Sequence, residues 1–314
     1  MALRIVFCGT PAFAVPSFEL LSRDPDFQIA GVVTQPDRPR GRGHEMHSSP
    51  VKKAAAAAGI PVYQPEKIKS EEGFDYFTRL APDAVVIIAY GQIISPRLIG
   101  IPRLGWINLH ASLLPKYRGA APINWAIVNG ETRTGVTTMQ IDAGLDTGPT
   151  LLKYETEIAR DETAPALRAR LAVAGAPLVA ESLKKLDRGE ITPMPQDNSQ
   201  ATVAPVLKKS DGLIDWERSA RIIYNKIRGL QPWPGAFTTF RGKGCQIWGK
   251  PLQPISAGGM PGVMLPTQED GLLVICGSNS VLRVEHLQLE GRKRVTDAEF
   301  MNGARIVPGE RFGS

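Results

Sequence analysis

The chain has 314 residues, of which 43% are hydrophobic and 22% charged, as expected for one large globular domain or two ordinary ones. It has no apolar run near the roughly 20 residues that a membrane-spanning helix needs, and its start resembles a strand rather than a secretory leader. The net charge is +6; after residue 207, 15 Lys and Arg face 10 Asp and Glu, an excess that would attract a polyanion but also occurs on ordinary solvated surfaces.

Strand and helix signals alternate along the first 190 residues or so, which is typical of an α/β domain with a parallel sheet. Short apolar runs predict strands at residues 4–8, 28–34, 83–89, 105–110 and 137–141. Capping and periodicity predict helices at residues 12–22, 49–59, 122–129 and 164–186. The second of these helices has the clearest signals, with Ser49 as cap, Pro50 at the first position and Gly59 after an alanine run.

The composition changes at residues 191–200, which are polar, contain prolines and show no periodicity. We interpret residues 190–207 as a linker between a catalytic domain at 1–189 and a smaller domain at 208–314. In the smaller domain we expect a helix at 219–228 and then short strands, with a spacing typical of a small barrel, at 236–240, 245–248, 262–265, 272–276 and 281–288. Thr296 and Glu299 have the spacing of a capping box and predict a final helix.

The segment from residue 108 to residue 119 carries the strongest functional signal, and it reads Asn-Leu-His-Ala-Ser-Leu-Leu-Pro-Lys-Tyr-Arg-Gly. Asn108 and His110 are two residues apart, so on a strand their side chains lie on the same face. An amide beside an imidazole at a strand end suits a site that stabilises an oxyanion and moves a proton. A core histidine beside a turn-forming asparagine would give the same short pattern.

A second candidate lies at residues 142–148, which read Asp-Ala-Gly-Leu-Asp-Thr-Gly. Ligands of parallel sheets bind at the carboxyl ends of the strands, and this loop follows the strand at 137–141. We therefore expect Asp146 to return to the edge where Asn108 and His110 lie. An aspartate in such a glycine-flanked turn is usually only a turn former, so its candidacy depends on the other two residues.

The sequence offers little support for a metal or a dinucleotide. Cys8, Cys245 and Cys276 are widely separated, and buried reduced thiols are the simplest interpretation. No CxxC or HExxH pattern occurs and the four histidines are scattered, so we expect no metal site. The first strand is not followed by GxGxxG, which disfavours a dinucleotide cofactor.

Several long motifs in this order resemble those of the folate-dependent formyltransferase family. Besides the segments at 108–119 and 142–148, the likeness includes residues 7–16, 35–39, 41–43 and 229–236, and it extends over nearly the whole chain. The resemblance implies a Rossmann-like, mostly parallel sheet domain followed by a smaller OB-like β-barrel domain that binds tRNA. It further implies transfer of the formyl group of 10-formyltetrahydrofolate to the amino group of methionyl-initiator tRNA, in the cytoplasm, for translation initiation.

The family pattern makes Asn108, His110 and Asp146 the catalytic residues. Asn108 and a protonated His110 would donate hydrogen bonds to the oxyanion that forms when an amine attacks the formyl carbon. Asp146 would orient the imidazolium and, through water, take the proton that the amine loses. This chemistry needs no covalent enzyme intermediate, so we do not expect Ser112 to be a nucleophile.

The resemblance also assigns the formyl donor's binding site. The stretch that corresponds to the family's folate-binding segment is Ser112, Leu113, Leu114 and Pro115. The residues expected to complete a slot for the flat pterin are Tyr90, Gly91, Gln92, Ile93 and Asp142. For the segment at 90–94, core packing at a strand end is an equally good interpretation.

Three basic clusters are candidates for contact with tRNA, namely Arg38, Arg40 and Arg42 in a charged arm, Lys208 and Lys209 at the linker exit, and Arg292 and Lys293 near the end. Where the family commonly has lysines after Gly43, this chain has His44 and Glu45, which weakens the field of the arm. An ordinary solvated surface is the alternative for each cluster.

Two other functions are compatible with the same residues. One is a folate-dependent transformylase that acts on a small amine, such as glycinamide ribonucleotide or an amino sugar nucleotide. The other is a non-catalytic RNA-binding protein. The basic C-terminal third favours tRNA over a small amine, and the intact set of Asn108, His110 and Asp146 argues against a protein that only binds. We expect a monomer with no membrane partner.

Overall fold

The computed structural model describes residues 1–40, 45–252, 258–307 and 309–313. Contacts between backbone positions divide the chain into two compact units. The first unit comprises residues 1–122, 133–157 and 168–204, and the second comprises residues 123–132, 158–167 and 205–314. The second unit thus includes two short segments that precede the C-terminal third in the sequence.

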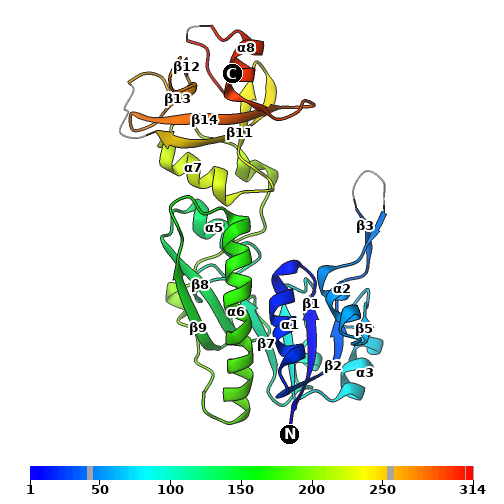
Figure 1. The fold of residues 1–314 in the computed structure, drawn as a ribbon. Helices are drawn as coiled ribbons and strands as arrows, with labels where there is room; N and C mark the ends of the chain where they lie inside the picture. Colours follow the sequence, from blue (N-terminus) through cyan, green and yellow to red (C-terminus); the bar gives the residue numbers. More distant parts are fainter. Residues whose placement is uncertain (41–44, 253–257, 308, 314) are drawn as a thin grey trace. The chain divides into compact units, whose positions relative to one another are not determined.

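A seven-stranded sheet forms the centre of the first unit, in the order β5-β2-β1-β6-β7-β8-β9 (Figure 1). The first five strands of this order are parallel, β8 is antiparallel to β7, and β9 is antiparallel to β8. The mostly parallel sheet predicted from the sequence is therefore confirmed. The strands are β1 Leu3–Gly9, β2 Phe27–Val33, β5 Val62–Tyr63, β6 Ala84–Ile88, β7 Trp106–His110, β8 Arg133–Gln140 and β9 Thr150–Glu157.

Helices cover both faces of this sheet. On one face, α1 (Val15–Arg23) places the Phe18 ring 5.5 Å from that of Phe7, and α6 (Ala164–Asp187) places Gly175 directly against Leu109. On the other face, α3 (Glu71–Leu80) packs Phe77 against Trp106, with ring centres 5.0 Å apart. Since side chains alternate along a strand, Asn108 and His110 share the α3 face with Trp106.

Local signals explain most helix starts in the first unit. Helix α2 (Pro50–Ala57) begins after Ser49, whose side chain accepts a hydrogen bond from the Lys52 N–H at 3.0 Å, as the sequence predicted. A 3-10 turn precedes α1, and α4 (Pro96–Ile99) is a single turn. Four elements have no clear local signal in the sequence and were not predicted: α3, β5, β9 and the hairpin formed by β3 (Arg38–Arg40) and β4 (Glu45–His47).

The direction of β8 determines at which edge of the sheet the loop that carries Asp146 begins. Because β8 is antiparallel to β7, its last residue pairs with Ile107, and the Ile141 N–H donates to the Trp106 carbonyl at 2.8 Å. The loop at 141–149 therefore leaves the sheet beside the amino end of β7. Asp146 returns from there to His110, at the edge expected from the sequence, and the direction of β8 was not predicted.

Residues 191–204, expected to lie in a linker, are bonded to the first unit. Met194 exchanges two backbone hydrogen bonds of 2.8 Å with Thr150, the first residue of β9. Ten residues later, the Ala204 N–H donates to the Arg118 carbonyl at 2.7 Å. We refer to residues 194–204 as the strap, because both of its ends are attached to this unit.

The second unit is built on an antiparallel sheet in the order β10-β11-β14-β13-β12, with β15 paired to β14. Its strands are β10 Phe237–Phe240, β11 Lys243–Leu252, β12 Met264–Pro266, β13 Leu272–Cys276, β14 Ser280–Leu289 and β15 Val295–Thr296. Its helices are α5 Pro122–Val128, α7 Ala220–Gly229 and α8 Asp297–Ala304. Helix α8 begins with the predicted capping box, in which Thr296 and Glu299 each accept the other's backbone N–H.

The two early segments of the second unit are held by buried polar contacts. The Asn124 side chain of α5 donates to the Gly229 carbonyl at 2.6 Å. The buried Arg228 of α7 donates to the Glu162 carbonyl at 2.8 Å, and burial lowers the pKa of its guanidinium. Because buried polar groups are costly unless they are paired, these contacts fix the early segments on α7.

Candidate active site

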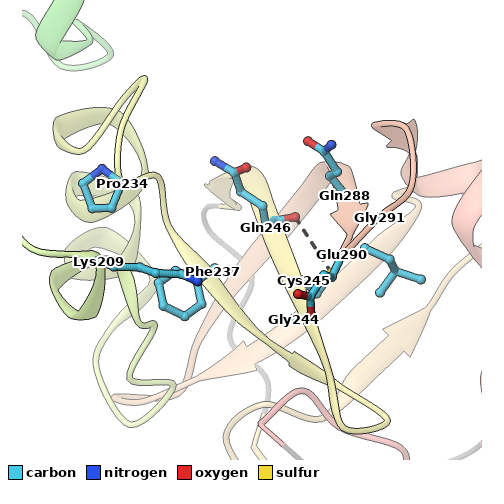
Figure 2. A pocket seen from close by; sticks show the side chains of 10 residues that line it. Lys209, Pro234, Phe237, Gly244, Cys245, Gln246, Gln288, Glu290 and Gly291 are labelled. Carbon is cyan, nitrogen blue, oxygen red and sulfur yellow. Dashed lines mark hydrogen bonds between the residues drawn. The ribbon is translucent and has the colours of Figure 1, made fainter. Parts of the chain in front are cut away.

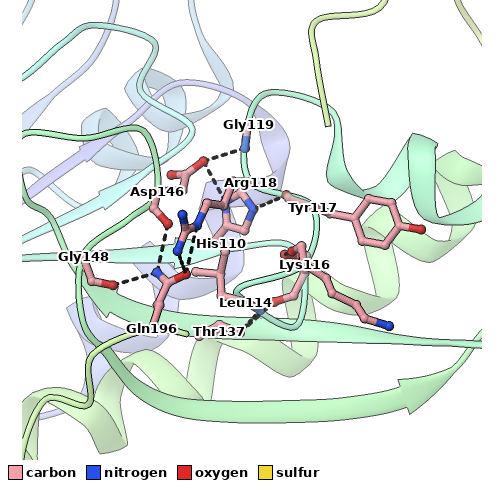
Figure 3. A network of polar contacts seen from close by, with 11 residues as sticks. His110, Leu114, Lys116, Tyr117, Arg118, Gly119, Thr137, Asp146, Gly148 and Gln196 are labelled. Atoms are coloured by element: carbon pink, nitrogen blue, oxygen red, sulfur yellow. Dashed lines mark hydrogen bonds and ion pairs between the residues drawn. The ribbon is translucent and has the colours of Figure 1, made fainter. Parts of the chain in front are cut away.

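His110 and Asp146 meet in the first unit, although they lie on different elements (Figure 3). His110 is the last residue of β7, and its Nδ1 lies 3.6 Å from Oδ2 of Asp146 in the loop between β8 and β9. The two side chains are 7% and 17% exposed, so water screens their interaction only weakly. The structure thus brings together two of the three residues predicted to be catalytic.

The hydrogen bonds of His110 identify which ring nitrogen is available for chemistry. Its Nε2 lies 2.9 Å from the Tyr117 carbonyl oxygen, and because a carbonyl only accepts, Nε2 is the donor and carries a hydrogen. At 3.6 Å, Nδ1 is too far from Asp146 for a full hydrogen bond. Nδ1 is therefore the nitrogen that can bond to a substrate while it stays under the influence of the carboxylate.

Asp146 is held in place by the backbone of residues 108–119, which we call the Asn108 motif. The Gly119 N–H donates to Asp146 Oδ2 at 2.8 Å. Gly148 permits a close approach of the loop to β8, because a Cβ at this position would lie 1.9 Å from the Gln140 carbonyl oxygen. Asp142 shapes the same loop, since its carboxylate accepts from the Gly144 N–H at 3.0 Å and from the Thr147 hydroxyl at 2.7 Å.

Asn108 lies two residues before His110 on the same face of β7 and is half-buried. Within the described ranges its carboxamide forms no hydrogen bond. Its N–H groups are therefore free to donate to an oxygen that is bound near Nδ1 of His110.

The polar atoms of the segment that follows His110 form hydrogen bonds with other parts of the protein. The Ser112 hydroxyl is buried and donates to the Lys116 carbonyl at 2.6 Å. The Leu114 N–H donates to the Thr137 hydroxyl at 3.2 Å, and its carbonyl accepts from Lys153 Nζ at 2.6 Å. Leu113 and Pro115 are half-buried. These bonds fix the shape of the stretch that was predicted to bind folate.

The predicted slot at residues 90–93 is divided between core and surface. The Tyr90 ring is 2% exposed and belongs to the core, and burial raises the pKa of its hydroxyl well above the ordinary value. Gln92 donates to the Pro65 carbonyl at 3.2 Å and accepts from the Ile68 N–H at 2.7 Å. In contrast, Ile93 and Leu145 are 87% and 67% exposed, respectively. Two large apolar side chains are thus available to cover a flat ligand.

The basic residues predicted to contact tRNA are surface residues where the structure describes them. Arg38, Lys208, Lys209, Arg292 and Lys293 are exposed. Arg40 ends β3, and its side chain, like all of Arg42, lies outside the described residues. The base of the arm is fixed by Lys52, which lies 2.6 Å from Asp37 and lowers the pKa of that carboxyl.

A separate pocket of about 320 Å³ lies in the second unit (Figure 2). Gln246 of β11 and Gln288 of β14 are register partners, and Figure 2 shows their side chains pointing in the same direction. Lys209, Phe237 and Glu290 also line this pocket. It places one of the predicted tRNA-binding lysines beside polar and aromatic groups.

Neither a metal centre nor a membrane segment emerges from the described part of the chain. Within it, no three His, Cys, Asp or Glu side chains are grouped so that they could hold a metal ion. None of the helices in these ranges combines the length and the apolar character that crossing a bilayer requires.

Three further residues contact the catalytic pair but were not predicted from the sequence: Tyr117, Gly119 and Gln196. The first two contact His110 and Asp146 through backbone atoms, which leave no signature in the side chains. Gln196 lies in the strap and contacts the backbone of Asp146. Its position in a polar, non-periodic segment gave no signal that could distinguish it from a linker residue.

Comparisons with known proteins show which family the chain resembles along its length. Residues 3–183 match the family model described as formyl transferase, and residues 206–305 match the formyl transferase C-terminal domain. A methionyl-tRNA formyltransferase of Solibacter usitatus is 52% identical over 311 residues, 99% of each chain, and that of Koribacter versatilis is 51% identical over 98% of each. In fold, the chain is similar to the crystal structure of WlaRD, a sugar 3N-formyl transferase, with a TM-score of 0.68 at 19% identity over 93% of this chain and all of that one.

Proposed function

The chain belongs to the formyl transferase family, and we propose that it transfers the formyl group of 10-formyltetrahydrofolate to the amino group of methionyl-initiator tRNA. The observation that carries this proposal is the pair formed by His110 Nδ1 and Asp146 Oδ2 at 3.6 Å, on the same strand face as Asn108, whose amide has no hydrogen-bond partner among the described residues. The choice of acceptor is supported by the relatives named methionyl-tRNA formyltransferase, which match essentially the whole chain.

We assign complementary roles to the three side chains. Attack of an amine on the formyl carbon places negative charge on the formyl oxygen, and preorganised donors lower the barrier to this step. Asn108 and the Nδ1–H of His110 donate to that oxygen, while the Nε2–H bond to Tyr117 keeps the ring in position. Asp146 stabilises the charged imidazole and, through a water molecule, accepts the proton that the amine must release. The bond between the formyl carbon and N10 of the donor then breaks, and this proton passes to N10 of the departing tetrahydrofolate.

The formyl donor fits between the two loops in this proposal. Its pterin would lie against the exposed side chains of Ile93 and Leu145, with the backbone of 112–115 and 142–145 supplying hydrogen bonds. Tyr90 and Gln92 would shape this slot from behind, since their side chains are engaged within the protein.

The tRNA would be held by basic residues of both units. Arg38, Arg40 and Arg42 belong to the arm, and Lys208, Lys209, Arg292 and Lys293 belong to the second unit. Contacts of this kind position a nucleic acid through its phosphates and give little base specificity. An enzyme that acts on initiator tRNA would work in the cytoplasm, and the monomeric state stays a prediction.

A formylation assay tests the proposal. The purified protein is mixed with 10-formyltetrahydrofolate and charged initiator tRNA, and N-formylmethionine is measured after deacylation. Formylated methionine is the expected product. Formyl transfer to glycinamide ribonucleotide instead would favour the small-amine alternative, and RNA binding without transfer to either acceptor would favour the non-catalytic one.

A further inference from the structure

We propose that Gln196 is a positioning residue that holds the Asp146 loop against the Asn108 motif, a role whose kinetic consequence rests on the proposed function. Gln196 lies in the strap, 50 residues from Asp146 and 78 from Arg118 along the chain. Its side chain contacts both of these residues (Figure 3).

The Gln196 amide uses its whole hydrogen-bonding capacity in this contact. Its oxygen accepts from Arg118 Nε at 3.0 Å and from Nη2 at 2.8 Å. Its nitrogen donates to the Asp146 carbonyl at 2.9 Å and to the Gly148 carbonyl at 2.7 Å. The reversed amide would face two carbonyls with its oxygen and a guanidinium with its N–H groups, so the partners define one orientation.

Three consecutive residues connect this clamp to the catalytic pair. The Tyr117 carbonyl accepts from His110, the Arg118 side chain holds Gln196, and the Gly119 N–H donates to the Asp146 carboxylate. Asp146 is therefore held at two points, through its carboxylate by Gly119 and through its own carbonyl by Gln196. Arg118 and Asp146 are also joined indirectly, because the Gln196 side chain bonds to both of them.

The backbone conformations on both sides of the pair explain why such support is needed. Asp146 has φ of 53° and Tyr117 has φ of 60°, the left-handed region that residues with a Cβ rarely adopt. A residue in this region persists only when its surroundings hold it there. Without Gln196, relaxation of Asp146 to a negative φ would turn its carboxylate away from His110.

The strap itself is fixed, so it can act as a support. Its Met194 end is paired with β9 and its Ala204 end is bonded to the Arg118 backbone. Asn198 adds a hydrogen bond of 2.8 Å to the Arg118 guanidinium. Gln196 thus lies between two anchored ends, and a displacement of its amide would be transmitted to the Asp146 loop.

Gln196→Glu tests this role with little change in size. The carboxylate keeps both contacts with Arg118 but places an oxygen against the carbonyls of Asp146 and Gly148. Since a misplacement of about 1 Å at a reacting group can cost about 100-fold in rate, we expect kcat to fall by about 10- to 100-fold. KM for methionyl-tRNA should stay near the wild-type value. Because residues 142–145 of the same loop would contact the pterin, kcat is measured at saturating 10-formyltetrahydrofolate.

Gln200→Glu is the matched control, because it makes the same change at an exposed position of the strap, where the side chain's one hydrogen bond within the described ranges goes to Asp197. It should have wild-type kinetics. A double variant separates positioning from general damage: if Gln196 acts through Asp146, Gln196→Glu should cost little further activity in an Asp146→Asn background. A full additional loss in that background would overturn the proposal, as would a wild-type kcat for Gln196→Glu alone.

Amide hydrogen exchange provides a readout that does not depend on the substrate. We expect faster exchange at residues 142–149 in Gln196→Glu than in Gln200→Glu. If the wild type does not formylate methionyl-tRNA, the proposed function fails, and the role of Gln196 is then decided by the exchange experiment alone. Unchanged exchange at residues 142–149 would overturn the proposal that Gln196 holds this loop. If the Glu variant does not fold, Gln196→Met, which removes the amide without adding charge, takes its place in both measurements.

Discussion

Removal of the Asp146 charge provides the most direct test of the catalytic pair. In Asp146→Asn, an amide oxygen in the place of Oδ2 can still accept the Gly119 N–H, which lies at 2.8 Å. The amide also has the size of the carboxylate, so the loop should keep its position. The substitution therefore removes charge next to His110 while it preserves the geometry.

The distance in the structure gives the expected magnitude. Two opposite unit charges 3.6 Å apart attract by about 5 kcal/mol at an effective dielectric constant of about 20, and by about 1 kcal/mol in bulk water. With side chains only 7% and 17% exposed, the pair is closer to the first condition. Because about 1.4 kcal/mol corresponds to a factor of ten, these two limits correspond to falls in kcat of about 5-fold and about 4 × 10³-fold, and we expect a fall nearer the upper limit.

The assay is single-turnover formylation of methionyl-tRNA at saturating 10-formyltetrahydrofolate, with rapid quenching. Affinities for the folate and for the tRNA are measured separately by titration, and thermal unfolding confirms that the variant is folded. Both affinities should match the wild type, because the charge acts mainly in the transition state. A kcat within about twofold of the wild type would refute the role of Asp146, since the charge would then have no catalytic effect.

Three other outcomes are expected. His110→Ala should lower kcat by about 10²- to 10³-fold with unchanged folate affinity in a binding titration, because it removes an oxyanion donor; unimpaired turnover would exclude His110 from the mechanism. Ser112→Ala should cost about 1 kcal/mol in a urea unfolding experiment, from one lost hydrogen bond, and leave kcat nearly unchanged, whereas a nucleophile could not be replaced. Lys209→Ala should raise KM for tRNA and reduce its salt dependence without lowering kcat, and a fall in kcat alone would contradict a phosphate contact.

The reactivity of the cysteines gives a prediction that is independent of substrate. Burial raises the pKa of Cys245 and Cys276 to about 12, and it raises the pKa of Cys8 as well. Because only the thiolate reacts, a thiol reagent at pH 8 should modify the native protein very slowly and all three thiols once the protein is unfolded. Rapid reaction of the native protein would mean that one of these positions opens to solvent.

The parts of the fold that depend on local signals could be predicted from the sequence. The apolar run at 84–88 gave β6, the cap at Ser49 gave α2, and the capping box at Thr296 gave α8. Helix α3 was missed although Ser70 caps it, because Gly73 in its first turn weakens the helix signal. Strand β9 was missed because residues 153–155 are exposed and the strand, at the edge of the sheet, has no buried apolar run.

For the site, the residues could be predicted from the sequence, but the elements and contacts that bring them together could not. The spacing of Asn108 and His110 fixed their shared face, because side chains alternate along any strand. The approach of Asp146 depends on the direction of β8, and a strand pattern carries no information about direction. The contacts of Tyr117 and Gly119 use backbone atoms, whereas the partners of Gln196 lie 48 to 78 residues away in the sequence.

The attachment of the strap has a consequence for how the protein could be divided. A fragment that ends at residue 189, where the composition changes, would lack the main-chain pairing with Thr150 and every bond that Gln196 makes. Ending the fragment after Ala204 would retain both. Polar composition marks where a chain leaves the hydrophobic interior, but the last residue that a reaction centre needs can lie well beyond that point.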